Sequence, residues 1–151
     1  MRIHSRGEAQ TLERGAVLSR RARARMLVCL KGPLGSGKTT FVRGFLRGLG
    51  HRGPVRSPAF GLVHEYPRLR PPVYHLDLYR VGQGELGGFG LEEYLADPRA
   101  ACMVEWPEVA RDWLGPDRLD VMFSYAEDGG RDLSFLARGP RSRALLRGLR
   151  P

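Results

Sequence analysis

Gly32-Pro33-Leu34-Gly35-Ser36-Gly37-Lys38-Thr39 is the stretch of sequence that decides the fold. It follows the phosphate-binding loop (P-loop) pattern, in which a glycine and four free positions precede Gly-Lys-Ser/Thr. The apolar run 26–30 comes directly before the loop and predicts a buried parallel strand. Apolar residues recur at helical spacing over 41–49, directly after the loop. The motif therefore has the strand–loop–helix setting that it requires.

Each residue type in the loop has a chemical reason. Glycines let backbone N–H groups converge on phosphate oxygens, and the helix that begins near Gly37 directs its positive end at the same anion. Lys38 adds a full charge that reaches the β- and γ-phosphates, and Thr39 offers a hydroxyl to Mg²⁺. An ordinary glycine-rich turn is the alternative, but the flanks agree with the motif. The loop predicts a nucleoside triphosphate and Mg²⁺, and it leaves open what the energy is used for.

The whole chain has the size and composition of one globular domain. It has 151 residues and a hydrophobic fraction of 42%, so we expect a single P-loop ATPase domain over residues 1–151. No apolar run approaches the length of a membrane span, and the N-terminus lacks an apolar signal region, which favours the cytoplasm. Cys29 and Cys102 each lie in an apolar run without metal-ligand spacing, so we expect buried free thiols.

The formal net charge is +9, and all basic residues except Lys31 and Lys38 are arginine. Arginines cluster over 20–25 and again over 141–150. A positive surface attracts nucleic acid or an acidic protein partner. A solvated face is the plainer interpretation of each cluster, because charge alone argues for solubility rather than for a site.

Acidic residues end two further apolar runs. Asp77 follows the run 73–76, and Glu105 follows the run 100–104. A strand that ends in a carboxylate is typical of the second half of a nucleotide site, where the acid holds Mg²⁺ or orients water. Since ligands of open α/β sheets bind outside the carboxyl ends of the strands, we expect both acids to converge on the metal–phosphate site. A salt bridge between Asp77 and Arg80 is the alternative for the first acid.

The other segments complete an α/β pattern. Ser5-Arg6-Gly7-Glu8 has capping-box spacing and predicts the start of the first helix. Residues 108–114 predict a helix, and 119–125 and 133–137 predict antiparallel strands joined by Asp128-Gly129-Gly130. We therefore predict a three-layer α/β P-loop NTPase fold, with a mainly parallel sheet and an antiparallel C-terminal hairpin.

Five motifs stand together in this order: the P-loop continued by Thr40, Ser57-Pro58-Ala59-Phe60, His75-Leu76-Asp77-Leu78-Tyr79-Arg80, Gly90-Leu91-Glu92-Glu93-Tyr94 and Glu105-Trp106-Pro107. With this set the chain resembles the TsaE (YjeE-type) family, the small P-loop ATPases of bacterial tRNA threonylcarbamoyladenosine (t6A) formation. The resemblance runs from about Thr11 to Arg131. The P-loop is shared with many families, whereas Asp-Leu-Tyr-Arg and Glu-Trp-Pro at this spacing are much more specific.

The resemblance implies ATP and Mg²⁺ as cofactors. Thr39 and Glu105 would hold Mg²⁺, and the catalytic residues would be Lys38, Glu105 and Asp77. Asp77 would act near the γ-phosphate, in hydrolysis or as an outer-shell partner of the metal. Trp106 would lie beside the site. On physical grounds alone the two acids can exchange roles, because either carboxylate binds Mg²⁺ or positions a water. The ATP-binding residues would be Thr11 near the adenine, Gly35, Ser36, Gly37, Lys38, Thr39, Thr40 and, from the C-terminal hairpin, Arg131.

The resemblance also implies a switch segment over 57–60 and two protein partners. Ala59 stands where the family usually has threonine, which removes a hydroxyl from that segment. The partners would be the transferase subunit TsaD and its companion TsaB, with any tRNA contact indirect and no membrane contact.

Two other functions are alternatives to an Mg-dependent ATPase that supports t6A37 modification. A small-molecule kinase also uses a P-loop, but such kinases usually close an arginine-bearing lid over the acceptor, and the glycine-rich stretch 82–90 contains no arginine. A non-enzymatic tRNA-binding module would use the arginine clusters, but it gives Lys38, Thr39, Asp77 and Glu105 no reason to occur together.

Overall fold

The computed structural model describes residues 1–58, 62–82 and 85–149, so Ala59 and Phe60 of the expected switch segment lie outside the described residues. Its strands are β1 (Arg2–Ser5), β2 (Leu27–Lys31), β3 (Val63–Tyr66), β4 (Val73–Asp77), β5 (Ala101–Glu105), β6 (Leu119–Tyr125) and β7 (Arg131–Ala137). Its α-helices are α1 (Glu8–Ser19), α2 (Lys38–Gly48), α3 (Leu91–Ala96) and α4 (Pro140–Arg147), and two 3₁₀ helices are η1 (Leu86–Gly88) and η2 (Pro107–Trp113).

All these strands form one sheet in the order β1-β7-β6-β2-β5-β4-β3. The four central strands, β6, β2, β5 and β4, run parallel to one another. The C-terminal hairpin β6–β7 is antiparallel, as are β1 beside β7 and β3 beside β4 at the two edges. The prediction of an α/β sheet with a parallel centre and an antiparallel C-terminal hairpin is confirmed. The edge strand β1 was not predicted.

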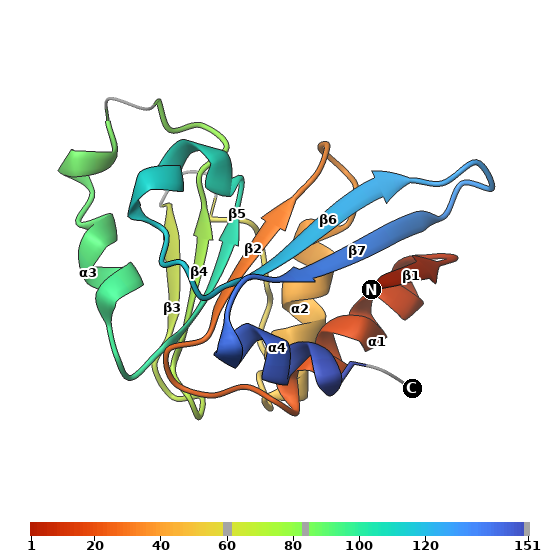
Figure 1. Cartoon of the computed structure of the whole chain (residues 1–151), viewed down its shortest axis with the longest axis horizontal. Coiled ribbons are helices and arrows are strands. Elements are labelled where there is room, and N and C mark those ends of the chain that lie inside the picture. Colours follow the sequence, from red (N-terminus) through yellow and green to blue (C-terminus); the bar gives the residue numbers. More distant parts are fainter. Residues whose placement is uncertain (59–61, 83–84, 150–151) are drawn as a thin grey trace.

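The sheet lies between two layers of helices (Figure 1). Helices α1, α2 and α4 cover one face, where Phe41, Phe45 and Phe123 are almost fully buried. The short helices α3 and η2 lie over the β3–β5 half of the other face, above a second apolar cluster that includes Leu76 and Val104. The predicted three-layer arrangement is therefore present, although the third layer spans only part of the sheet.

The opposite half of that second face is more open. Met122 on β6 and Leu136 on β7 keep 49% and 50% of their surface exposed. The predicted helix over 108–114 is 3₁₀ rather than α, and a kink at Ala110, with φ −100° and ψ 21°, interrupts it. Both cysteines are buried and free, as predicted. No helix within the described ranges is long and apolar enough to cross a membrane.

The start of the first helix differs from the prediction. Helix α1 does begin at Glu8, but its N-cap is Gly7 and no side chain caps it. Ser5 is instead the last residue of β1, which pairs with β7. Its hydroxyl bonds with Thr11 Oγ1 at 2.8 Å and donates to the Gly7 carbonyl at 2.9 Å. The capping-box interpretation was wrong because sheet pairing takes Ser5 away from the helix end.

Helices α1 and α2 approach each other closely at two glycines. A Cβ atom on Gly15 would lie 2.1 Å from the Phe41 carbonyl oxygen, and one on Gly44 would lie 2.0 Å from the Leu12 carbonyl oxygen. Only glycine fits at either place without moving backbone atoms. The contact holds α1 beside the helix that follows the P-loop, and it brings Thr11 against the loop.

Candidate functional site

The P-loop connects β2 to α2 through backbone conformations that favour glycine. Gly32, Gly35 and Gly37 have φ angles of 139°, 72° and 103°, and a Cβ on Gly32 would lie 2.5 Å from the Phe123 carbonyl oxygen. Helix α2 begins at Lys38 with Gly37 as its N-cap. The first N–H groups of a helix have no partner within it, so the loop and helix start together form a ready anion site.

Ser36 adds an unpaired polar atom to the loop. Its side chain is fully buried, and Oγ has no hydrogen-bond partner among the described residues. Buried hydroxyl groups are rarely left unpaired in native proteins. A ligand oxygen held by the loop would supply the missing partner.

Lys38 lies almost buried under the loop, with 4% of its surface exposed. Its Nζ donates hydrogen bonds to the carbonyl oxygens of Gly32 at 2.7 Å and Pro33 at 2.8 Å. The same atom stands 4.3 Å from the centroid of the Trp106 ring. Burial lowers the pKa of Lys38, while the negative charge of Glu105 opposes that shift. The loop's own carbonyl groups thus hold the Lys38 ammonium group beneath the loop.

Thr39 and Glu105 join the start of α2 to the end of β5. Thr39 Oγ1 donates a hydrogen bond to Glu105 Oε1 at 2.9 Å. The same carboxylate oxygen lies 2.8 Å from His75 Nε2. Glu105 is 3% exposed and His75 is fully buried. The hydroxyl and the carboxylate that the sequence predicts as metal ligands are therefore in direct contact.

Asp77 lies next to Glu105 in the sheet, because the two are register partners in the parallel pair β4–β5. Asp77 Oδ2 accepts a hydrogen bond from Ser57 Oγ, and Oδ1 accepts one from the backbone N–H of Tyr79 at 3.0 Å. The described start of the expected switch segment therefore contacts the second acid. Both carboxylates lie at the carboxyl ends of the parallel strands β4 and β5, as predicted.

Thr11 and Arg131 reach the P-loop from opposite ends of the chain. A Cβ on Gly37 would lie 3.5 Å from Thr11 Cγ2. Arg131 Nη2 lies 3.5 Å from the Gly35 carbonyl oxygen, and its guanidinium lies 4.5 Å from the centroid of the Tyr125 ring. Thr40 is half-buried in the first turn of α2. The structure therefore gathers all the predicted site residues at one end of the sheet.

Two residues of the candidate site, Tyr125 and His75, were not predicted from the sequence. Tyr125 donates a hydrogen bond to the Leu34 carbonyl oxygen and supports Arg131, which ties the C-terminal hairpin to the loop. His75 contacts Glu105, although its place in the His75–Arg80 motif did not predict a role for it. A signal was available for His75, because it precedes Asp77 by two residues on one strand and alternation places both on the same face.

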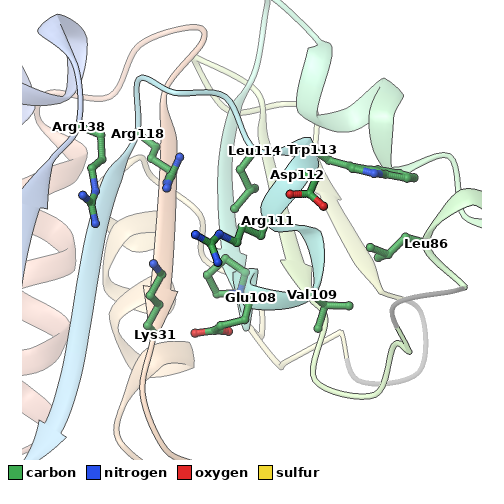
Figure 2. Close-up of a pocket in the computed structure, with 11 residues that line it drawn as sticks. Lys31, Leu86, Glu108, Val109, Arg111, Asp112, Trp113, Leu114, Arg118 and Arg138 are labelled. Atoms are coloured by element: carbon green, nitrogen blue, oxygen red, sulfur yellow. The ribbon is translucent and has the colours of Figure 1, made fainter.

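A separate cavity of about 800 Å³ lies beside η2 (Figure 2). Lys31, Arg118 and Arg138 line one side of it, and the residues of η2 line the other. These three cations surround Asp120, with nitrogen–oxygen distances of 3.5 Å, 3.2 Å and 2.9 Å. The residues that line this cavity include no predicted ATP or Mg²⁺ ligand, so it is distinct from the candidate site.

Comparisons of the sequence with known proteins point to one family. A family model described as "Threonylcarbamoyl adenosine biosynthesis protein TsaE" matches residues 5–133. The TsaE protein of Bacillus subtilis is 39% identical over 115 residues, covering 76% of this chain and 72% of that protein. The TsaE protein of Treponema pallidum is 32% identical over 135 residues, covering 89% and 98%.

A comparison with solved structures finds the same fold. The crystal structure of YdiB from Bacillus subtilis superposes with a TM-score of 0.86 at 31% sequence identity, over 99% of this chain and 93% of that one. Both the sequence match and the shared fold extend over most of the chain. The chain belongs to the TsaE family of threonylcarbamoyl adenosine biosynthesis proteins.

Proposed function

We propose that this protein is an Mg²⁺-dependent ATP hydrolase that serves t6A37 modification of tRNA. The observation that carries the proposal is the 2.9 Å hydrogen bond between Thr39 and Glu105, formed beside the buried ammonium group of Lys38. It unites the hydroxyl, the carboxylate and the cation at the carboxyl end of a parallel sheet, which is where α/β proteins bind nucleotides.

The residues present fit ATP and Mg²⁺. The unpaired Ser36 hydroxyl and the glycine backbone of the loop suit phosphate oxygens. Thr39 and Glu105 offer the hard oxygen ligands that Mg²⁺ prefers. Within the described ranges, no group of three or more His, Cys, Asp or Glu side chains would hold a metal by itself. That agrees with Mg²⁺, which protein sites usually hold through one or two carboxylates together with the phosphates of the substrate.

Each side chain has a distinct task in the proposed reaction. Mg²⁺, when bound, would neutralise charge on the β- and γ-phosphates. Lys38 would exchange its contacts with the loop carbonyls for phosphate oxygens and stabilise the charge that develops on them. Asp77 would orient the attacking water, and Ser57 and the Tyr79 N–H hold its carboxylate in place for that purpose. Thr11 and Arg131 would contact the nucleotide from the two flanks of the loop.

Two variants test the division of labour between the acids. Glu105→Gln should raise the Mg²⁺ requirement, because a charged oxygen ligand becomes a neutral amide. Asp77→Asn should lower turnover and leave nucleotide affinity nearly unchanged. Titration of Mg²⁺ in a phosphate-release assay and calorimetric nucleotide affinities measure both effects. If Asp77→Asn shifts the Mg²⁺ dependence and Glu105→Gln does not, the two roles are reversed.

TsaD and TsaB are the proposed protein partners, and the membership in the TsaE family supports this proposal. We expect the activity in the cytoplasm, where tRNA is modified, with any tRNA contact made through the partners. A pull-down from native extract with and without ATP should recover both proteins. Phosphate release in the absence of any acceptor distinguishes this ATPase from the alternative, a small-molecule kinase, because a kinase requires an acceptor.

A further inference from the structure

We propose that His75 is a positioning residue for the metal site: it holds Glu105 Oε1, so that Oε2 is the oxygen left for Mg²⁺. The inference rests on the proposed function, since it assigns a role toward the cation that Glu105 would bind. In this role His75 acts through Glu105 and needs no contact with the nucleotide.

The location of His75 is unusual for a histidine with a purely structural role. It is fully buried in the centre of β4. Val73 and Asp77 lie on the same face of the strand, because side chains alternate along it. Nδ1 of His75 has no hydrogen-bond partner in the described part of the chain. Core packing does not explain a buried polar ring that is only half satisfied.

The one described hydrogen bond of the His75 side chain goes to Glu105. An ionised carboxylate can only accept, so Nε2 carries the proton in this pair and donates it to Oε1 at 2.8 Å. Thr39 Oγ1 donates to the same oxygen. In the described part of the chain, both side-chain hydrogen bonds of Glu105 therefore end on Oε1.

Two consequences follow for the cation site. Because the Thr39 hydroxyl proton points at Glu105, the lone pairs of Oγ1 remain for Mg²⁺. Because His75 and Thr39 both hold Oε1, the carboxylate cannot rotate freely, and Oε2 stays available in one orientation. Residues behind metal ligands that fix ligand orientation in this way typically change metal affinity 10–100-fold when they are replaced.

The test compares replacements that differ in reach. In His75→Gln the amide nitrogen extends about as far as Nε2 and donates a hydrogen bond, whereas the shorter amide of His75→Asn does not reach Glu105. His75→Leu removes the donor altogether. His64→Gln is the matched control, because His64 is the register partner of His75 on β3 and has no described bond to Glu105. Calorimetry measures the affinity for ADP in excess EDTA and over a Mg²⁺ titration.

For His75→Asn and His75→Leu we expect at least a tenfold higher Mg²⁺ concentration at the midpoint of the titration, with ADP affinity in EDTA unchanged. His75→Gln should recover most of the wild-type Mg²⁺ dependence, and His64→Gln should retain all of it. If His75→Leu does not fold, the comparison of Asn with Gln decides the question.

Two outcomes would overturn the inference. One is an unchanged Mg²⁺ midpoint in His75→Asn, and the other is an equal loss of ADP affinity with and without Mg²⁺, which marks a general structural defect. These outcomes leave the proposed ATPase standing as long as the wild type depends on Mg²⁺. A wild-type protein whose ADP affinity ignores Mg²⁺ overturns the role of His75, whereas one whose phosphate release ignores Mg²⁺ contradicts the proposed function.

Discussion

Gly44→Ala is expected to destabilise the protein even though alanine is the better helix former. Gly44 faces α1 from within α2, and the added Cβ would lie 2.0 Å from the Leu12 carbonyl oxygen and 2.7 Å from its carbonyl carbon. These are backbone atoms of a second helix, so no side-chain rotation relieves the contact. Ordinary contact begins at 3.4 Å, and the two helices would have to separate by about 1.4 Å, the difference between 3.4 Å and 2.0 Å.

The size of the effect follows from two opposing terms. Replacing a helical glycine by alanine gains about 1 kcal/mol of helix propensity. Overpacking a close contact costs about 1–3 kcal/mol, and more when backbone must move. Because the clash here is with backbone, we expect a net loss of about 2 kcal/mol in the free energy of unfolding. For a protein of this size that lowers Tm by roughly 4–8 °C.

Thermal unfolding followed by circular dichroism measures the change, and calorimetry of nucleotide binding measures its effect on the site. Affinity should weaken as well, because displacement of α1 moves Thr11 away from Gly37. Gly115→Ala is the control, since nothing lies within 4 Å of its Cβ position, and its Tm should stay within about 2 °C of the wild type. A Gly44→Ala protein as stable as the wild type, or more stable, would refute the close-contact reasoning.

Two further predictions concern single charged groups. Lys38→Ala should lower turnover by about 10²–10³-fold while circular dichroism shows an intact fold, because the variant loses charge stabilisation at the phosphates; unchanged hydrolysis in a folded variant would contradict the P-loop assignment. Burial alone would raise the pKa of Asp117, but hydrogen bonds from the N–H groups of Ser142 and Arg141 at the start of α4 outweigh it and lower the pKa to about 2. A depressed pKa stabilises the fold above the unfolded value of 3.8, and this stabilisation is lost as the pH falls towards 2. Asp117→Ala should therefore lower the free energy of unfolding by about 1 kcal/mol at pH 7, because it removes the carboxylate that caps α4. In urea unfolding, the stability of this variant should fall less than that of the wild type between pH 4 and pH 2; equal pH profiles would exclude the capping role.

Much of the fold was predictable because the central strands are buried on both faces and appear as apolar runs. The runs before Gly32, Asp77 and Glu105 became β2, β4 and β5. The edge strand β1 was not predicted because its four residues, Arg-Ile-His-Ser, contain no apolar run and because backbone groups make its pairing with β7. The same pairing invalidated the helix cap expected at Ser5, since a long-range contact outweighed a local motif.

Residues of the candidate site could be predicted only where they belong to a recognisable sequence motif. The loop residues and the two acids have recognisable patterns, and the structure brings them together, while their roles stay predictions. The contact between His75 and Glu105 depends on which strands are neighbours, and the sequence alone does not reveal that β4 pairs with β5. The support of Arg131 by Tyr125 likewise depends on the fold of a hairpin across from the loop.

Trp106 gives this protein its own optical reporter. The residue adopts a left-handed backbone conformation, at φ 56° and ψ 52°, and its indole ring lies 4.3 Å from the Lys38 ammonium and 4.8 Å from the Tyr79 ring. Indole emission responds to a nearby charge, so departure of the ammonium from the ring face changes the colour and intensity of the fluorescence. Because Trp113 is the chain's other tryptophan, a Trp113→Phe protein confines that emission to Trp106. The position of the lysine can then be followed in solution without a label.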